Sequence, residues 1–247
     1  MKKSILGLAG LIVIACTLIS WIPVKTKSAE ITPVAVNDST INEQIDEIYN
    51  AANLAISGLS LAVFKKAATG FYNLKEAGKV SDHKSILSIA DFDLSSKKKR
   101  LWIVDLEKET LILNTWVAHG TFSGGDVATN FSNTIESQKS SVGFYVTAEA
   151  YYGKHGLSLR LDGMDNGFNS NARQRAIVVH GADYVSEQTI SALGRLGRSQ
   201  GCPAVPSEQA GMVVRAMEDK TVLFIHSSNS FYTSPYLFEH QQILASK

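Results

Sequence analysis

The chain contains one cysteine in a context suited to nucleophilic chemistry. Cys202 lies in the segment GRSQGCPAVP, between Gly201 and Pro203. A proline biases the preceding residue toward an extended backbone, and nearby glycines permit tight turns. The segment therefore predicts a thiol that projects from a turn rather than from a regular helix or strand.

A histidine that can serve this thiol lies 22 residues earlier. His180 follows the apolar run AIVV, which predicts a short strand ending in His180-Gly181. An ordinary thiol is only a few per cent ionised at neutral pH, and an adjacent imidazole can take its proton and later return it to a leaving amine. We therefore expect His180 to act on Cys202. The backbone N–H groups of the Gly201–Cys202 turn would stabilise an oxyanion, each contributing roughly 3 kcal/mol.

The N-terminus predicts export. Two lysines precede an uncharged, mostly apolar run from Ser4 to Val24, so residues 1–29 are expected to be a signal peptide or a retained signal anchor. The run VIAC also resembles a weak lipoprotein box ending at Cys16. Because Cys16 lies in this leader, Cys202 is the only thiol of residues 30–247 and has no internal disulfide partner. Such a thiol is either buried and inert or used for its reactivity.

Charge and length exclude one class of partner and set the size of the core. Residues 1–29 carry four lysines and no acid, which leaves 20 basic and 23 acidic residues in the rest of the chain. This balance gives no electrostatic footprint for nucleic acid. The remaining length is enough for one sizeable core.

Helices are expected first and strands later. The runs STINEQIDEIYNAANLAIS, with Thr40 and Glu43 as a capping box, and LSLAVFKKAATGFYNLKEAG, ending near Gly78, have helical periodicity. Residues 30–84 are therefore expected to form a linker and a helical N-terminal region.

From about residue 85 the chain consists of β-rich runs separated by Gly/Ser/Asn-rich segments. The runs are SILSIADF, RLWIVDL, TLILNTWVAHG, VGFYVTAEAYYG, LSLRL, AIVVH and TVLFIHS. Only SEQAGMVVRAMEDK is expected to be helical in this half, with Ser207 as its N-cap. Residues 85–247 therefore predict a mainly β catalytic domain behind the helical region, in a chain that is α+β overall.

At these residues the chain resembles the murein L,D-transpeptidase catalytic domains of bacterial cell walls. The family motif is a histidine-glycine at a strand end, followed by Ser/Thr-His-Gly-Cys. Here it reads His180-Gly181 and Ser199-Gln200-Gly201-Cys202. The resemblance covers about residues 85–240 and implies a β-sandwich catalytic domain. Gln200 stands where the commonest form has histidine, at a position that is not the general base, so this departure bears on loop packing and acceptor preference.

The resemblance implies a peptidoglycan-modifying acyltransferase of the periplasm or cell envelope. Cys202 would attack the third residue of a tetrapeptide stem, release D-alanine and pass the acyl group to an amine on a second stem. An envelope lipoprotein, another amine or water can replace that acceptor. His180 would be general base and then general acid, with a backbone carbonyl orienting its ring. No metal or organic cofactor is called for, and a carbapenem is the expected covalent inhibitor.

Further residues are candidates for the loop and the groove. Ser199 and Gly201 would shape the oxyanion loop, Arg198 would hold a stem-peptide carboxylate, and Tyr184 would line the groove. Their ordinary roles are a turn serine, a turn glycine, a surface arginine and a packing tyrosine.

Other polar residues are weaker candidates. His119 is interpreted as groove wall or structural, and Arg160 and Asn133 carry still weaker signals. The remaining histidines have no metal-ligand spacing with the cysteine, so no zinc site is expected; they are His83, His155, His226 and His240.

Three other functions compete with transfer. The same site could hydrolyse stems or cross-links, as an L,D-carboxypeptidase does. A non-catalytic wall-binding module could have kept the scaffold, and a secreted cysteine peptidase of another fold would use the same thiol chemistry. The usual helix-borne cysteine of such peptidases does not fit GCPAVP. The acceptor, cleavage of the leader, the role of the N-terminal helices and the oligomeric state stay open at the level of sequence.

Overall fold

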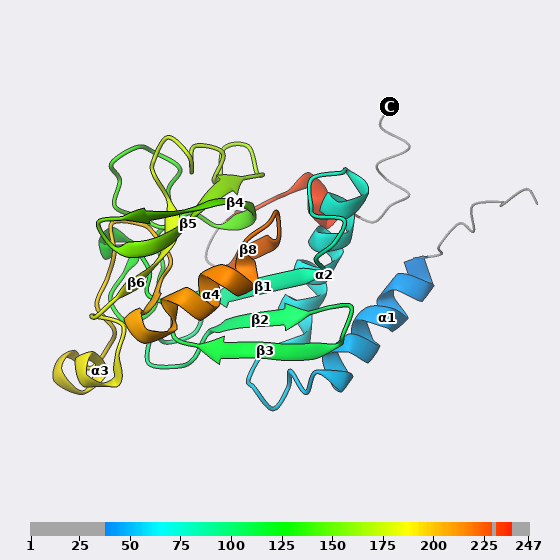
Figure 1. Cartoon of the computed structure of the whole chain (residues 1–247), viewed down its shortest axis with the longest axis horizontal. Helices are drawn as coiled ribbons and strands as arrows, with labels where there is room; N and C mark the ends of the chain where they lie inside the picture. The colour runs from blue at the N-terminus through cyan, green and yellow to red at the C-terminus, as the bar shows by residue number, and fades with distance from the viewer. Residues whose placement is uncertain (1–37, 229–230, 239–247) are drawn as a thin grey trace, which may run out of the picture. The chain divides into compact units, whose positions relative to one another are not determined.

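The computed structural model describes residues 38–228 and 231–238 of the chain (Figure 1). The expected leader, the linker up to residue 37 and His240 lie outside the described residues. Among the helices that are described, none combines the length and apolar character needed to cross a membrane.

Within the described residues, eight strands form one hydrogen-bonded sheet in the order β3-β2-β1-β8-β4-β5-β6-β7. The β1–β8 and β6–β7 pairs are parallel, and the other neighbouring pairs are antiparallel. The predicted fold class, a mainly β domain with an α-helical N-terminal region, is confirmed, with the strands joined in one continuous sheet. The strands are β1 (Ile86–Asp91), β2 (Leu101–Asp105), β3 (Thr110–Thr115), β4 (Gly143–Gly153), β5 (Gly156–Gly163), β6 (Val178–Ala182), β7 (Ala204–Pro206) and β8 (Val222–His226).

The two N-terminal helices cover one face of the sheet. These helices, α1 (Asp38–Ala51) and α2 (Leu61–Glu76), share a buried apolar cluster with alternate residues of the central strands, including Trp102 and Phe144. Helix α2 lies very close to the sheet at Gly70, where an added Cβ would be 1.9 Å from the Phe144 ring. The helices therefore share a core with the sheet rather than forming a separate one.

The opposite face of the sheet is covered by α4 (Ala210–Met217) (Figure 1). Val213, Val214 and Met217 of this helix are buried against the strand residues of the second face, such as Tyr145. Because side chains alternate between the two faces of a strand, the fully buried central strands read as nearly continuous apolar runs.

The sequence prediction of the helices needs three corrections. Helix α1 begins at Asp38, so Thr40 lies inside it and is not its N-cap. A helix was not expected at α3 (Glu187–Leu193), which has no buried residue and therefore no apolar periodicity to reveal it. Ser207 opens a short 3-10 helix, η2 (Ser207–Gln209), and its hydroxyl donates to Asp183 Oδ1 at 2.6 Å instead of capping α4.

Two strand predictions also need correction. His180 lies in the middle of β6, which continues to Ala182, rather than at the end of the strand. The three-residue strand β7 was not expected, because its sequence is too short to show an alternating pattern. Both differences matter for the site, because β7 pairs with β6 directly beyond the cysteine.

Candidate active site

The imidazole of His180 is held by its own strand. The residue is only 3% exposed, and Nδ1 lies 2.9 Å from the carbonyl oxygen of Gly181. A carbonyl oxygen can only accept, so Nδ1 carries the proton and Nε2 keeps its lone pair. Among the described residues Nε2 has no hydrogen-bond partner, which leaves it free to accept a proton.

The cysteine is positioned by the parallel pairing of β6 and β7. The register sets His180 opposite Ala204, two residues after Cys202. The thiol is half-buried and donates to the carbonyl oxygen of Ala176 at 3.7 Å. Both side chains are described, and no hydrogen bond joins the thiol to the imidazole in this structure. The two residues are thus on neighbouring segments of one sheet edge, with the thiol resting against the start of β6.

The environment keeps both groups neutral near pH 7. Burial raises the pKa of the Cys202 thiol, opposed by the N–H of Val178 and by the positive charges of Arg175 and Lys154. Burial also lowers the pKa of His180. A neutral thiol and a neutral imidazole are the starting state for general-base attack, rather than a preformed ion pair.

The loop before the cysteine is closed by Ser199. Its hydroxyl donates to the carbonyl oxygen of Cys202 at 2.6 Å and accepts the N–H of Gly201 at 3.0 Å. Gly201 has φ of 121°, and an added Cβ would lie 2.8 Å from the carbonyl oxygen of Lys139, so the position requires glycine. The Gly201 N–H is therefore engaged within the loop. The Cys202 N–H has no acceptor in the described part of the chain and remains the candidate oxyanion donor.

Arg198 and Tyr184 flank this loop. Arg198 Nη1 donates to the carbonyl oxygens of Thr121 and Gly124, at 3.0 and 2.8 Å, so its guanidinium braces a neighbouring loop. Binding of a stem carboxylate by Arg198 stays a prediction. Tyr184 is half-buried, and burial, with a smaller contribution from the Cys202 thiol, raises its pKa to about 12. Tyr184 is therefore within electrostatic range of the sulfur.

Arg175 is a site residue that the sequence analysis missed. Its guanidinium donates to four groups on the loop at residues 132–141: the carbonyl oxygens of Ser132 and Lys139, at 2.7 and 2.5 Å, and the hydroxyls of Ser141 and Ser137, at 2.5 and 3.2 Å. The same group opposes the rise of the thiol pKa. The run NARQRA offers two arginines, and only the tertiary structure shows which one faces the cysteine.

His155 was also missed as a site residue. It lies in the turn between β4 and β5, and its ring stacks on that of His180 with 4.4 Å between centroids and 26° between planes. In the sequence His155 was a candidate only for metal-ligand spacing, which this contact does not involve.

The weaker candidates have structural contacts. His119 is 1% exposed, accepts from Arg100 Nη2 at 2.8 Å, and burial together with Arg100 lowers its pKa to about 4. This agrees with a structural residue. Arg160 pairs with Glu149 at 2.9 Å, and Asn133 makes hydrogen bonds between loops.

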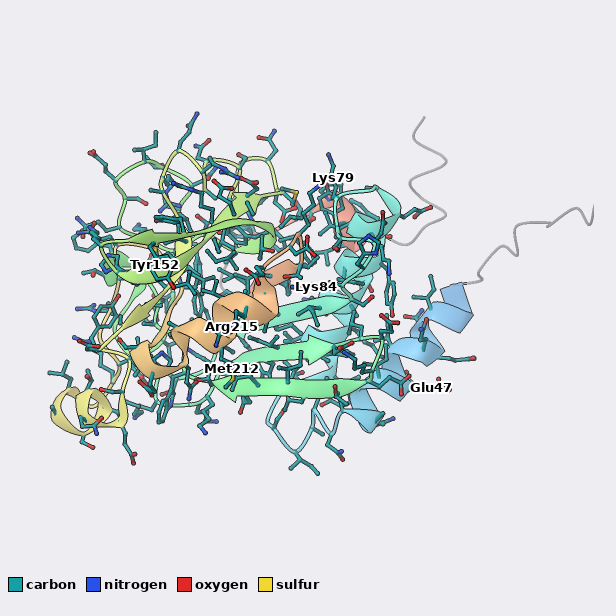
Figure 2. All side chains as sticks on the ribbon, in the orientation of Figure 1. Glu47, Lys79, Lys84, Tyr152, Met212 and Arg215 are labelled. Atoms are coloured by element: carbon teal, nitrogen blue, oxygen red, sulfur yellow. The ribbon has the colours of Figure 1, made fainter. Side chains whose placement is uncertain are left out.

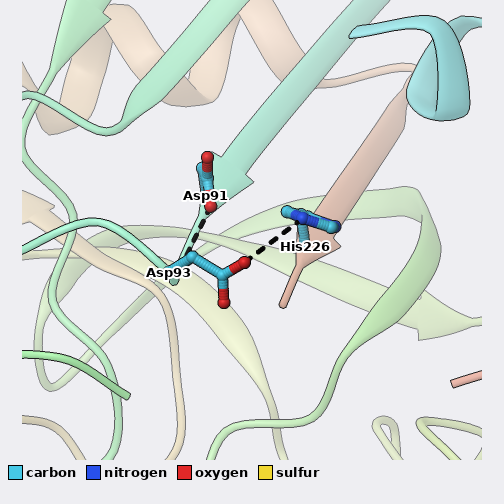
Figure 3. Close-up of side chains that lie close together, drawn as sticks. All are labelled: Asp91, Asp93 and His226. Atoms are coloured by element: carbon cyan, nitrogen blue, oxygen red, sulfur yellow. Dashed lines mark hydrogen bonds and ion pairs between the residues drawn. The ribbon is translucent and has the colours of Figure 1, made fainter. Parts of the chain in front are cut away.

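One cluster of the described residues has the composition of a metal site but lies apart from the cysteine. Asp91, Asp93 and His226, at the ends of β1 and β8, have candidate ligand atoms within 4.8 Å of one another (Figure 3). Asp93 is already bound by the Ser227 hydroxyl at 2.9 Å, by the N–H of Ser228 at 3.0 Å and by His226 Nε2 at 3.5 Å. Contacts within the protein thus satisfy much of this cluster, and neither Cys202 nor His180 belongs to it.

A shallow depression of about 610 Å³ lies elsewhere on the sheet. Charged side chains line it, among them Lys84, Glu149, Glu218 and Lys220, and neither Cys202 nor His180 does. Lys84 precedes β1 and lies near α4 (Figure 2). The depression is therefore separate from the two residues of the candidate site.

Comparison with known proteins gives one sequence match and several distant structural ones. A family described as L,D-transpeptidase catalytic domain matches residues 55–226. A search of curated proteins finds no match.

The similar solved structures share little sequence with the chain. They include an L,D-transpeptidase from Mycobacterium smegmatis (10% identity, 58% of this chain and 59% of that one, TM-score 0.36). A second is the helical cell shape determining protein Pgp2 from Campylobacter jejuni (13% identity, 68% of this chain and 58% of that one, TM-score 0.37). A third is L,D-transpeptidase 3 from Mycobacterium tuberculosis in complex with a faropenem-derived adduct (13% identity, 58% of this chain and 61% of that one, TM-score 0.36). The chain thus spans about three fifths of the length of these proteins, and the assignment to a family rests on the sequence match.

Proposed function

The chain belongs to the L,D-transpeptidase catalytic domain family, and from this we propose that it is an exported, peptidoglycan-modifying acyltransferase with Cys202 as nucleophile. One observation carries the proposal. The His180 ring is oriented by the Gly181 carbonyl with Nε2 left free, on a strand paired in register with the segment that follows the thiol.

In the acylation step the thiol attacks the carbonyl of the diamino acid at position three of a tetrapeptide stem. His180 Nε2 takes the thiol proton as the sulfur–carbon bond forms. The Cys202 N–H donates to the oxyanion of the tetrahedral intermediate. The intermediate collapses by breaking the bond to D-alanine, whose nitrogen receives the proton from the imidazolium. The product is a thioester on Cys202 and free D-alanine.

In the second step an acceptor amine attacks the thioester carbonyl. It passes a proton to His180 Nε2 as the carbon–nitrogen bond forms, and the departing sulfur takes that proton back. A side-chain amine on a second stem gives a 3–3 cross-link, and an amine of an envelope protein gives a protein attachment. Water in the same position gives hydrolysis, which is the nearest rival outcome.

Groups near the sulfur favour negative charge on it. As the sulfur departs in the second step, the Val178 N–H and the positive charge of Arg175 stabilise the negative charge that develops on it before it takes the proton. The Ser199 hydroxyl bridges the Gly201 N–H and the Cys202 carbonyl, which holds the loop and leaves the Cys202 N–H for the oxyanion. Arg198 and Tyr184 flank the loop that carries the thiol, and a role for them in binding the stem is part of this proposal.

Export and inhibition complete the proposal. Peptidoglycan lies outside the cytoplasm, which fits the apolar leader over residues 1–29 as a signal or an anchor. A carbapenem, whose strained carbonyl accepts a thiolate, is expected to acylate Cys202 covalently.

Muropeptide analysis tests the proposal. Purified wild-type protein is incubated with disaccharide tetrapeptides, and the products are separated and weighed, with Cys202→Ala as the matched control. New 3–3 dimers with release of D-alanine support transfer, and tripeptides without dimers identify a hydrolase that uses the same site. Cell-wall binding equal in wild type and Cys202→Ala, with no turnover by either, would overturn the enzyme and leave a binding module.

A further inference from the structure

The two histidines of the site form a stacked pair that joins two separate parts of the sheet. His180 lies inside β6 and is nearly buried, whereas His155 lies in the exposed turn between β4 and β5. Antiparallel pairing of β5 with β6 sets Ser158 opposite His180, so the end of the hairpin reaches the imidazole. Tyr152, which Figure 2 labels, belongs to the same hairpin and is exposed.

The stacking covers one face of the imidazole that must accept the proton. Ring centroids 4.4 Å apart with 26° between the planes leave no room for water between the rings. The bond from Nδ1 to the Gly181 carbonyl fixes one edge of the ring, and the stacked ring limits rotation about the remaining torsion. The two contacts together define where Nε2 points.

The groups facing His180 determine how removal of this contact would be detected. Lys154 and His155 face it from the β4–β5 turn, while β5 and β7 present the uncharged Ser158 and Ala204. Burial is the main cause of the lowered pKa of His180, with His155 and Lys154 adding to it. Loss of the His155 ring would therefore expose the imidazole, remove a like charge and raise its pKa toward the ordinary value.

We propose that His155 is a positioning residue, whose ring covers the imidazole of His180 and holds Nε2 in the direction of the thiol. The inference rests on the proposed function. His155 touches neither the sulfur nor the reacting carbonyl in this account; it acts through the general base. The alternative is a surface histidine that stacks without consequence.

Three variants separate these readings. His155→Ala removes the cover, His155→Phe keeps an aromatic plane without ring nitrogens, and His83→Ala changes an exposed histidine outside the site. The ring proton of His180 is titrated by NMR in each variant, and kcat and KM for stem cleavage are measured across pH.

The expected pattern is graded. In His155→Ala the His180 titration moves to higher pH, and kcat falls by about ten- to a hundredfold with KM little changed, because a misdirected base costs rate rather than binding. In His155→Phe the titration moves less and most of kcat is kept. A His155→Ala protein that matches His83→Ala in both measurements overturns the inference. A shifted titration in a protein without turnover upholds the positioning contact and overturns the proposed function instead.

Discussion

Replacing Arg175 should loosen the loop behind the thiol and make the thiol less reactive. The guanidinium donates four hydrogen bonds to the loop at residues 132–141. Each of these hydrogen bonds is taken to contribute about 1 kcal/mol, a low value for a charged donor, because the Arg175 side chain is half exposed. Arg175→Gln should therefore lower the free energy of unfolding by about 4 kcal/mol. For a domain of this size that corresponds to a fall of about 8–16 °C in Tm. Arg175→Lys should keep part of this, because an ammonium retains fewer of the four bonds.

The thiol supplies a second readout. Because Arg175 opposes the rise of the Cys202 pKa, its removal should raise that pKa further. A higher pKa means less thiolate at pH 7, so alkylation by iodoacetamide should slow in Arg175→Gln. Rates are followed by intact mass, and unfolding by urea titration.

Arg173→Gln is the matched control. Arg173 lies two residues earlier and makes ion pairs with Asp162 at 2.6 Å and Glu149 at 2.8 Å, but on an exposed surface. Exposed pairs contribute about 0–1 kcal/mol each, so this variant should remain close to wild type in stability and in thiol reactivity. If Arg175→Gln were as stable as Arg173→Gln and its thiol reacted as fast, the assigned role of Arg175 would be wrong.

Three further outcomes are expected. The acid limb of kcat/KM should have its midpoint below the ordinary histidine range, because burial lowers the pKa of His180 and the neutral imidazole is the base; a midpoint above that range would contradict this. Gly201→Ala should lower the free energy of unfolding by about 2 kcal/mol and kcat by tenfold or more, because φ at this position is 121° and the added Cβ would meet the Lys139 carbonyl oxygen. Unchanged turnover would show that the shape of the loop before Cys202 does not matter for the reaction. Asp165→Ala should lower the free energy of unfolding in urea by about 3 kcal/mol, because the buried Asp165 carboxylate accepts hydrogen bonds from the hydroxyls of Tyr232 and Ser234 in the segment at residues 231–238. A change below about 1 kcal/mol would contradict this role.

The sheet was predictable because most of its strands are buried on one or both faces. Runs such as AIVVH and TVLFIHS carry the apolar residues that the two cores require, and these runs form β6 and β8. Helix α3 was not predicted because none of its residues is buried, so no apolar residues mark one face of it. Strand β7 was not predicted because three residues are too few to show an alternating pattern. The spacing of apolar residues along the sequence therefore reveals elements that are buried and long enough to show a period.

The candidate site was predictable only where a motif marks it. Cys202 and His180 were chosen from residue type and spacing, and β6–β7 pairing then relates them in register. Arg175 and His155 act through contacts across loops and strands that are distant in sequence. The use of the Gly201 N–H inside its own loop also depends on one serine rotamer, which no spacing rule reports.

Acid-quenched intact mass of the protein during turnover of a tetrapeptide stem shows whether Cys202 forms a thioester with the substrate. The protein should gain a mass equal to the stem without its D-alanine, and digestion should map it to the peptide that contains Cys202. The adduct should be absent in Cys202→Ala and should form at least about a hundredfold more slowly in His180→Ala, because a positioned base contributes that much to proton transfer. Consumption of the stem with no adduct, or with an adduct at another residue, would contradict the role of Cys202 as nucleophile.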